Sequence, residues 1–294
     1  MATFRSPATQ AASVMQVVQG TELRSVGTVR NYEQALTRVA EWTQQQRLDG
    51  GLRGMTPELA VRYLEERGQA VGQKTLDMER QAMQCMMEHV TQQLPPGEPL
   101  PVIKSEHQQA LEGRAYTAVQ VDRIVDAQTP KNALATEIAY AAGLRAHELL
   151  TLQPAGERTA DPRPALDTKF TGREGVIYTV EGKGGLVREV QLPRDLAERL
   201  EAQRLDTPQR VTDRGIFYQS HYDIGGGQRW SNSFSAAADR ALGWSTGAHG
   251  LRHSYAQERM IELQNRGLIR DQALETVSQE LGHFRPEITE VYLR

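Results

Sequence analysis

Six side chains that can act on a phosphodiester are spread over residues 145–292 of this 294-residue sequence. They are two arginines, a lysine, two histidines and a tyrosine: Arg145, Lys183, His249, Arg252, His283 and Tyr292. Cleavage of a phosphodiester without a metal ion needs clamps for the nonbridging oxygens, a nucleophile, and groups that move protons. This set contains a candidate for each of those roles.

Two arginines are the candidate phosphate clamps, and a tyrosine is the candidate nucleophile. The planar guanidinium groups of Arg145 and Arg252 match charged phosphate oxygens better than ammonium groups do. Tyr292 can form a covalent bond to phosphorus if cationic neighbours activate its oxygen. The three side chains together predict attack on a clamped phosphate.

The remaining three candidates would move protons. Lys183 lies between glycines at the expected tip of a hairpin, where it can donate a proton to a leaving sugar hydroxyl. His249 and His283 can accept the tyrosine proton or donate to the phosphate, because imidazoles titrate near neutral pH.

Each candidate also has a simpler interpretation when taken singly. Arg145 could be an exposed charge at a helix start, Lys183 a solvated hairpin tip, and Tyr292 a packing group. His249 and His253 lie one helical turn apart and could bind zinc in principle, but no third ligand stands out. We interpret His253, like His147, as structural or supporting, and we predict no metal and no cofactor.

The order of these residues resembles the tyrosine recombinases (phage-integrase family). Ala142–Leu149 is similar to the segment that bears the first catalytic arginine of that family, and Gly182–Gly184 to its β-hairpin lysine motif. His249–Ser254 resembles the His-x-x-Arg box. Leu281–His283, followed by Tyr292, is similar to the final histidine and the nucleophile. All six positions occur in the family's order over about residues 117 to 294.

The resemblance implies a C-shaped clamp around duplex DNA. Tyr292 would form a 3′-phosphotyrosyl bond, and the freed 5′-hydroxyl would attack the partner strand. Four protomers on two DNA sites would exchange strands, with accessory DNA-bending or directionality proteins as further partners. The expected role is integration or excision of a mobile element. Two alternatives remain: a topoisomerase of type IB-like chemistry, and a catalytically idle DNA-binding protein on the same scaffold.

One departure from the family concerns the residues after the nucleophile. Relatives continue into a helix that docks on a neighbouring protomer, whereas only Leu293 and Arg294 follow Tyr292 here. Either the sequence stops short of that helix or assembly is handled otherwise, and we expect weak assembly, with a monomer or weak tetramer in the absence of DNA.

Composition bounds the function classes. The net charge is −3, from 34 Lys and Arg against 37 Asp and Glu, so a basic DNA-binding face would need an acidic back. A single cysteine, Cys85, excludes an internal disulfide and a cysteine-based zinc site. No apolar run approaches the roughly 18 to 20 residues of a membrane span, and no signal peptide is visible. We expect a cytoplasmic protein that associates with the nucleoid when it binds DNA.

The pattern of apolar residues and prolines predicts a mainly α fold with a small antiparallel β-sheet, divided into two domains. Residues 1–21 lack apolar periodicity and are interpreted as a flexible N-terminal arm. Residues 22–93 are predicted to form a helical domain, which by its layout resembles the core-binding domain of the tyrosine recombinases, and the proline-bearing residues 94–113 a linker. Residues 114–294 are predicted to form the catalytic domain.

Local signals place the expected elements. In the first domain, helices 28–48 and 75–90 are expected to face DNA, with three basic side chains as phosphate contacts: Arg30, Lys74 and Arg80. In the second, Thr117 and Thr129-Pro130 predict helix starts, and a further helix is expected after Arg145. Alternating residues 176–180 and 186–192 predict a β-hairpin, and residues 206–230 are expected to contain a loop.

Overall fold

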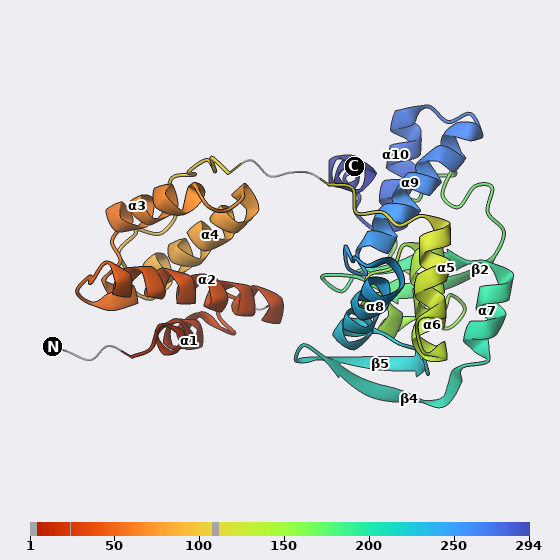
Figure 1. Cartoon of the computed structure of the whole chain (residues 1–294), viewed down its shortest axis with the longest axis horizontal. Helices are drawn as coiled ribbons and strands as arrows, with labels where there is room; N and C mark the ends of the chain where they lie inside the picture. The colour runs from red at the N-terminus through yellow and green to blue at the C-terminus, as the bar shows by residue number, and fades with distance from the viewer. Residues whose placement is uncertain (1–4, 24, 108–111) are drawn as a thin grey trace. The chain divides into compact units, whose positions relative to one another are not determined.

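The computed structural model describes residues 5–23, 25–107 and 112–294, and the chain forms two compact units, residues 1–110 and 111–294 (Figure 1). Helices predominate in both units, and the strands form two small antiparallel sheets in the second. The predicted fold class is therefore confirmed. Within the described ranges, every helix is too short or too polar to cross a membrane.

The first unit is a bundle of four helices with one short 3-10 turn. Its elements are α1 (Pro7–Val18), α2 (Val26–Gln45), η1 (Gly51–Gly54), α3 (Pro57–Gly68) and α4 (Gln73–His89). One face of α2 is buried, as Leu36 and Val39 show. Thr56 caps α3 by accepting a hydrogen bond from the backbone N–H of Leu59.

Helix α1 corrects the interpretation of residues 1–21 as a flexible arm. Ser6 caps this helix and Pro7 occupies its first turn. Its buried residues follow helical spacing and pack into the core of the unit: Ala11, Val14, Met15 and Val18. The surrounding glutamines and alanines masked this stripe in the sequence. The helical domain therefore begins near residue 7 rather than residue 22.

The proline-rich segment after α4 also differs from its predicted role as a spacer. Leu94 and Leu100 are buried in the core of the first unit. The backbone N–H of Leu100 donates to the side chain of Gln84 at 2.6 Å, and the carbonyl oxygen of Ile103 accepts from the side chain of Gln73 at 3.0 Å. Residues 94–105 are therefore part of the helical unit, because leucines between the prolines supply apolar contacts. Residues 108–111 of the expected linker lie outside the described residues.

The second unit combines helices with two hairpins. Its elements are α5 (Ala118–Asp126), α6 (Pro130–Ala142), η2 (Glu148–Thr151), β1 (Gln153–Pro154), β2 (Val176–Glu181), β3 (Val187–Leu192), α7 (Arg194–Glu201), β4 (Arg204–Asp213), β5 (Ile216–Tyr222), α8 (Gly227–Leu242), α9 (Gly250–Asn265), α10 (Arg270–Leu281), α11 (Pro286–Thr289) and η3 (Glu290–Leu293). The sheets have strand orders β1-β2-β3 and β4-β5. In Figure 1, α5, α6 and α8 lie next to one another above β4 and β5, and α9 and α10 lie towards the top of the view.

Most local predictions in this unit are confirmed. Thr117 and Gln120 form a reciprocal capping box at the start of α5. The predicted hairpin pairs Val176 with Leu192, and its turn contains Lys183. Two expectations are wrong: the helix after Arg145 is only the single 3-10 turn η2, and the expected loop contains the second hairpin, β4 and β5. That hairpin is largely exposed, so it lacks a strong apolar alternation.

A buried carboxylate fastens the last two long helices together. Glu280 on α10 accepts hydrogen bonds from the hydroxyl of Tyr255 at 2.9 Å and from the guanidinium of Arg259 at 3.0 Å, and both charged side chains are fully buried. Arg259 also pairs with Glu262 at 2.7 Å. Helices α9 and α10 are therefore held by charge as well as by apolar contacts.

Neutralising Glu280 should destabilise the protein. Glu280→Gln leaves the buried Arg259 with the partly exposed Glu262 as its remaining carboxylate partner, so we expect the free energy of unfolding to fall by about 3 kcal/mol. Urea denaturation monitored by circular dichroism measures this change. The matched control is Glu287→Gln, at an exposed position on α11, which should change stability little. A loss for Glu280→Gln no larger than that of the control would contradict the prediction.

Candidate active site

The ring of Tyr292 packs against three histidine side chains of the same chain, those of His249, His253 and His283. Its side chain is 9% exposed, and its hydroxyl is 3.1 Å from Nε2 of His249. The ring centroids of His253 and His283 lie 4.7 and 5.0 Å from that of Tyr292. The guanidinium carbon of Arg252 lies 5.6 Å from the centroid of the tyrosine ring. Four of the six predicted residues are thus in one cluster.

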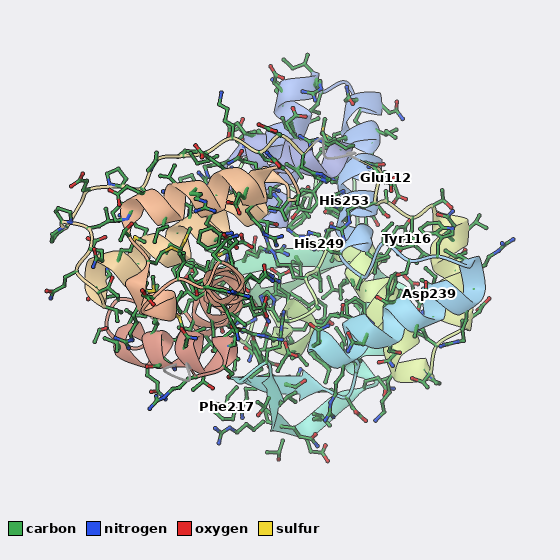
Figure 2. The ribbon with its side chains drawn as sticks, turned by 60° about the vertical axis from the view of Figure 1, so that its left-hand side comes forward. Glu112, Tyr116, Phe217, Asp239, His249 and His253 are labelled. Atoms are coloured by element: carbon green, nitrogen blue, oxygen red, sulfur yellow. The ribbon has the colours of Figure 1, made fainter. Side chains whose placement is uncertain are left out.

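The first turn of α9 brings three of these side chains together. His249 is the N-cap residue, and Arg252 and His253 follow in the first turn. Figure 2 shows His249 and His253 on the same helix, and their ring centroids are 5.8 Å apart. His249 and Arg252 are three residues apart, so both side chains lie on the same face of α9. This face contacts η3, which carries Tyr292.

Arg252 is fully buried and connects three segments of the site. It donates to the carbonyl oxygens of Gly143 and of Leu281, the latter at 3.1 Å. It also donates to Nε2 of His283 at 3.0 Å, while Nδ1 of His283 lies 2.9 Å from the hydroxyl oxygen of Thr289. Because a guanidinium can only donate, Nε2 of His283 accepts and its ring proton is on Nδ1.

Arg145 is joined to this cluster through a buried carboxylate. Nη1 of Arg145 donates to Oε1 of Glu148 at 2.9 Å, and the side chain of Arg145 keeps 23% of its surface exposed. Glu148 also accepts from Arg188 at 2.9 Å and lies 3.8 Å from Arg252. Burial alone would raise the pKa of Glu148, but the three guanidinium groups outweigh it and hold that pKa well below its usual range.

Lys183 lies apart from the other five residues. It is exposed on the turn between β2 and β3, and in the described part of the chain no hydrogen bond links it to them. The turn itself is near the site, since a Cβ placed on Gly182 would lie 3.3 Å from Oε1 of Glu148 and 4.0 Å from Nη1 of Arg145. Lys183 therefore directly follows a residue, Gly182, that lies close to Arg145 and Glu148.

The histidines of the cluster are held in the neutral form. Burial, with Arg252 and Arg145 nearby, lowers the pKa of His283 to about 3. Burial and Arg114 lower the pKa of His253 to about 4. Desolvation and Arg252 lower the pKa of His249 as well, although part of that side chain faces solvent. A neutral imidazole at His249 has a lone pair that can accept the proton of Tyr292.

Stability should decrease as the pH falls below neutrality. The folded-state pKa of His253, about 4, lies below the roughly 6.5 of an unfolded histidine, so the unfolded chain binds protons first. The stabilisation is complete above the unfolded pKa and is lost as the pH falls toward the folded one, by at most about 1.4 kcal/mol per pH unit. Urea denaturation between pH 7 and pH 5 measures the slope, and His253→Asn should flatten it. Equal slopes for both proteins would contradict the expectation.

Sequence reasoning missed two members of the site and underestimated a third. In the sequence, Glu148 is only a residue of the helix expected after Arg145, and nothing singles out Arg188. Arg188 is an inward-facing residue of β3, in alternation with the buried Val190 and Leu192, so that alternation was the available signal. His253, interpreted as supporting, contacts the ring of Tyr292 directly.

The structure also corrects one proposed DNA contact in the first unit. Arg80 is partly buried, and its Nη1 donates to the carbonyl oxygen of Leu100 at 3.2 Å, so it holds the segment after α4 in place. Arg30 and Lys74 are exposed.

Within the described residues, no group of three or more His, Cys, Asp or Glu side chains is arranged to hold a metal ion.

Comparisons with known proteins bear on this geometry. No family model and no curated protein sequence matches the chain. Among solved structures, XerH site-specific recombinase bound to palindromic difH substrate is 15% identical, with 99% of this chain and 94% of that chain covered and a TM-score of 0.57. A lambda integrase dimer bound to a COC′ core site is also 15% identical, with 95% and 96% covered and a TM-score of 0.58.

A third structure extends the likeness to a transposon protein. The Tn1549 transposon integrase in complex with a circular intermediate DNA is 12% identical, with 99% of this chain and 96% of that chain covered and a TM-score of 0.53. The chain has the fold of these recombinases. Because 95% or more of this chain and 94% or more of each of those chains are covered, the likeness spans both units.

Proposed function

We propose that this chain is a site-specific DNA recombinase that cleaves and rejoins strands through a covalent bond between Tyr292 and a 3′-phosphate. The observation that carries the proposal is the position of the Tyr292 hydroxyl, 3.1 Å from His249 and beside the buried Arg252. A phenol, a neutral imidazole and guanidinium groups are the parts that metal-free phosphodiester cleavage requires.

Each predicted residue has a step in the proposed reaction. The phenol oxygen of Tyr292 attacks phosphorus and its proton passes to His249. Arg145 and Arg252 stabilise the charge that grows on the nonbridging oxygens. The bond from phosphorus to the 5′-oxygen breaks, and Lys183 gives that oxygen a proton as the hairpin turn closes on the DNA.

Strand joining is the reverse of this reaction with a new partner. A 5′-hydroxyl attacks the phosphotyrosine and gives its proton to the neutral Lys183, and Tyr292 leaves as a phenol with the proton that His249 returns. His283 supports both directions by accepting from Arg252 and fixing the orientation of that guanidinium. The phosphotyrosine conserves the energy of the broken bond, so the proposed reaction uses no cofactor.

The solved structures suggest the substrate and the assembly. XerH and lambda integrase are described in complexes with difH and COC′ core site DNA, and lambda integrase also as a tetramer on a Holliday junction. For this chain we infer double-stranded DNA as the partner and four protomers on two paired sites. We also infer integration or excision of a mobile element as the role, in the cytoplasm, with accessory DNA-bending or directionality proteins as further partners.

We infer that both units bind the DNA. We propose that the helical unit is the core-binding domain, with Arg30 on α2 and Lys74 on α4 as phosphate contacts. The second unit would then be the catalytic domain. These two side chains should affect affinity for all sequences alike, since phosphate contacts carry no sequence information.

Covalent trapping tests the proposed function. A binding site is first selected from random duplexes, and a nicked version of that site then allows cleavage but not rejoining. We expect a DNA adduct that survives denaturation, and junction formation between two intact sites. Relaxation of supercoiled DNA without paired sites would instead indicate a topoisomerase. The absence of any adduct on a tightly bound site would indicate an idle DNA-binding protein.

A further inference from the structure

Arg188 is a buried arginine that connects two segments bearing candidate catalytic residues. It lies on β3 and is 4% exposed. Its Nη2 donates to Oε2 of Glu148 at 2.9 Å, and its Nη1 donates to the carbonyl oxygen of Glu280 at 2.6 Å. The first acceptor lies three residues after Arg145, and the second lies three residues before His283. One guanidinium therefore spans both segments.

The stem of Arg188 packs against the turn that leads to His283. Gly282 ends α10 in a left-handed conformation, with φ of +73°. A Cβ on Gly282 would lie 2.7 Å from Cδ and 3.1 Å from Nε of Arg188, so the glycine backbone rests directly on that side chain. A third connection runs along the chain, since Arg188 is the second residue of the strand that follows the Lys183 turn.

The charges around Glu148 explain why this position suits an arginine. Arg188 occupies Oε2 of Glu148 at 2.9 Å, while Arg252 remains 3.8 Å from the same oxygen. That oxygen also accepts from the backbone N–H of Arg145 at 2.7 Å, so without Arg188 the nearest remaining guanidinium would be that of Arg252. A tighter pair between Arg252 and Glu148 would draw the guanidinium away from His283 and from a bound phosphate.

The shape of the group matters as well as its charge. The two acceptors of Arg188 are a carboxylate oxygen and a backbone carbonyl on different elements, and the planar fork reaches both at once. A lysine ammonium at this position would reach one of them and leave the other unpaired. A methionine would satisfy neither acceptor.

We propose that Arg188 is a positioning residue for strand cleavage: it holds Glu148 and the turn before His283 so that Arg145 and Arg252 stay directed at the scissile phosphate. This inference rests on the proposed function and adds a residue to its machinery. Arg188 itself is too buried to touch DNA, so it acts through the clamps and not on the substrate.

The test measures cleavage and binding separately in variants of the full chain. For Arg188→Met we expect single-turnover adduct formation on the nicked DNA to slow by roughly 10- to 100-fold, because the clamps are misplaced. We expect DNA affinity to stay close to that of the unmodified protein. Arg188→Lys should be intermediate, and it decides the question if Arg188→Met does not fold.

The matched control is Arg259→Met, which removes another buried, ion-paired arginine of the same unit. Arg259 pairs with Glu280 and Glu262, and among the described residues no hydrogen bond or ion pair joins it to Glu148. This control should lose stability without a comparable loss of rate when both proteins are assayed well below their melting temperatures. Equal slowing in the two variants would show that Arg188 acts only through stability, and would overturn the proposal.

A double substitution separates positioning from general damage. If Arg188 acts through Glu148, its removal should slow the reaction less in a Glu148→Gln background than in the unmodified chain. Independent effects that simply multiply would contradict a role through Glu148. Failure of the proposed function is distinct from these outcomes, because then the unmodified chain itself forms no adduct and the inference falls with it.

Discussion

Tyr292→Phe should abolish the covalent DNA adduct and leave DNA binding intact. Phenylalanine keeps the ring that packs against His253 and His283, so the segment that carries it should stay in place. It lacks the oxygen that would bond to phosphorus, so no covalent intermediate can form. Denaturing gels of the nicked substrate measure the adduct, and gel-shift titration measures binding.

The control for this substitution is Tyr140→Phe. Tyr140 lies on α6, and its hydroxyl hydrogen-bonds to Glu258 rather than to any predicted site residue. That variant should form the adduct at a rate close to that of the unmodified chain. An adduct that persists in Tyr292→Phe would place the nucleophile elsewhere, and loss of DNA binding in that variant would show that Tyr292 serves structure first.

Arg145→Lys should slow cleavage by roughly 10²- to 10³-fold, the usual cost of removing one donor to a developing oxyanion. The guanidinium of Arg145 pairs with Glu148 through Nη1 and keeps further donors for a phosphate. An ammonium that pairs with Glu148 has no second donor fixed in that direction. Stability should change little, since lysine keeps a positive charge beside the buried Glu148.

Single-turnover adduct formation measures this effect, with saturating protein so that binding does not limit the rate. The matched control is Arg123→Lys, at an exposed position on α5. It should leave the rate unchanged. If Arg145→Lys reacted as fast as this control, Arg145 would be a structural partner of Glu148 and not a phosphate clamp.

The sequence predicts the parts of the fold that local chemistry determines. Thr117 and Gln120 form their capping box within one turn, and the hairpin around Lys183 follows from alternating residues and a glycine-rich turn. Helix α1 and residues 94–105 were misinterpreted because their order depends on contacts with distant helices. A weak stripe of alanine and valine, or two leucines among prolines, becomes structure only when a partner surface is present.

In the candidate site, too, the sequence predicts which residues take part but not which side chains hold them in position. The six residues could be chosen from their order alone, but their partners could not, because those partners are distant in sequence. Arg188 is 40 residues from Glu148 and 92 from Glu280, and no local pattern encodes either hydrogen bond. Arg80 was misassigned for a related reason, since its acceptor at Leu100 belongs to a segment interpreted as a spacer.

The identity of the residue that becomes bonded to DNA tests the central claim most directly. The trapped adduct is digested with nuclease and trypsin, and the modified peptide is sequenced by mass spectrometry. The account predicts a nucleotide attached through its 3′-phosphate to Tyr292, in the peptide that spans residues 271–294. A nucleotide on any other side chain, including one of the other eight of the nine tyrosines, would contradict it.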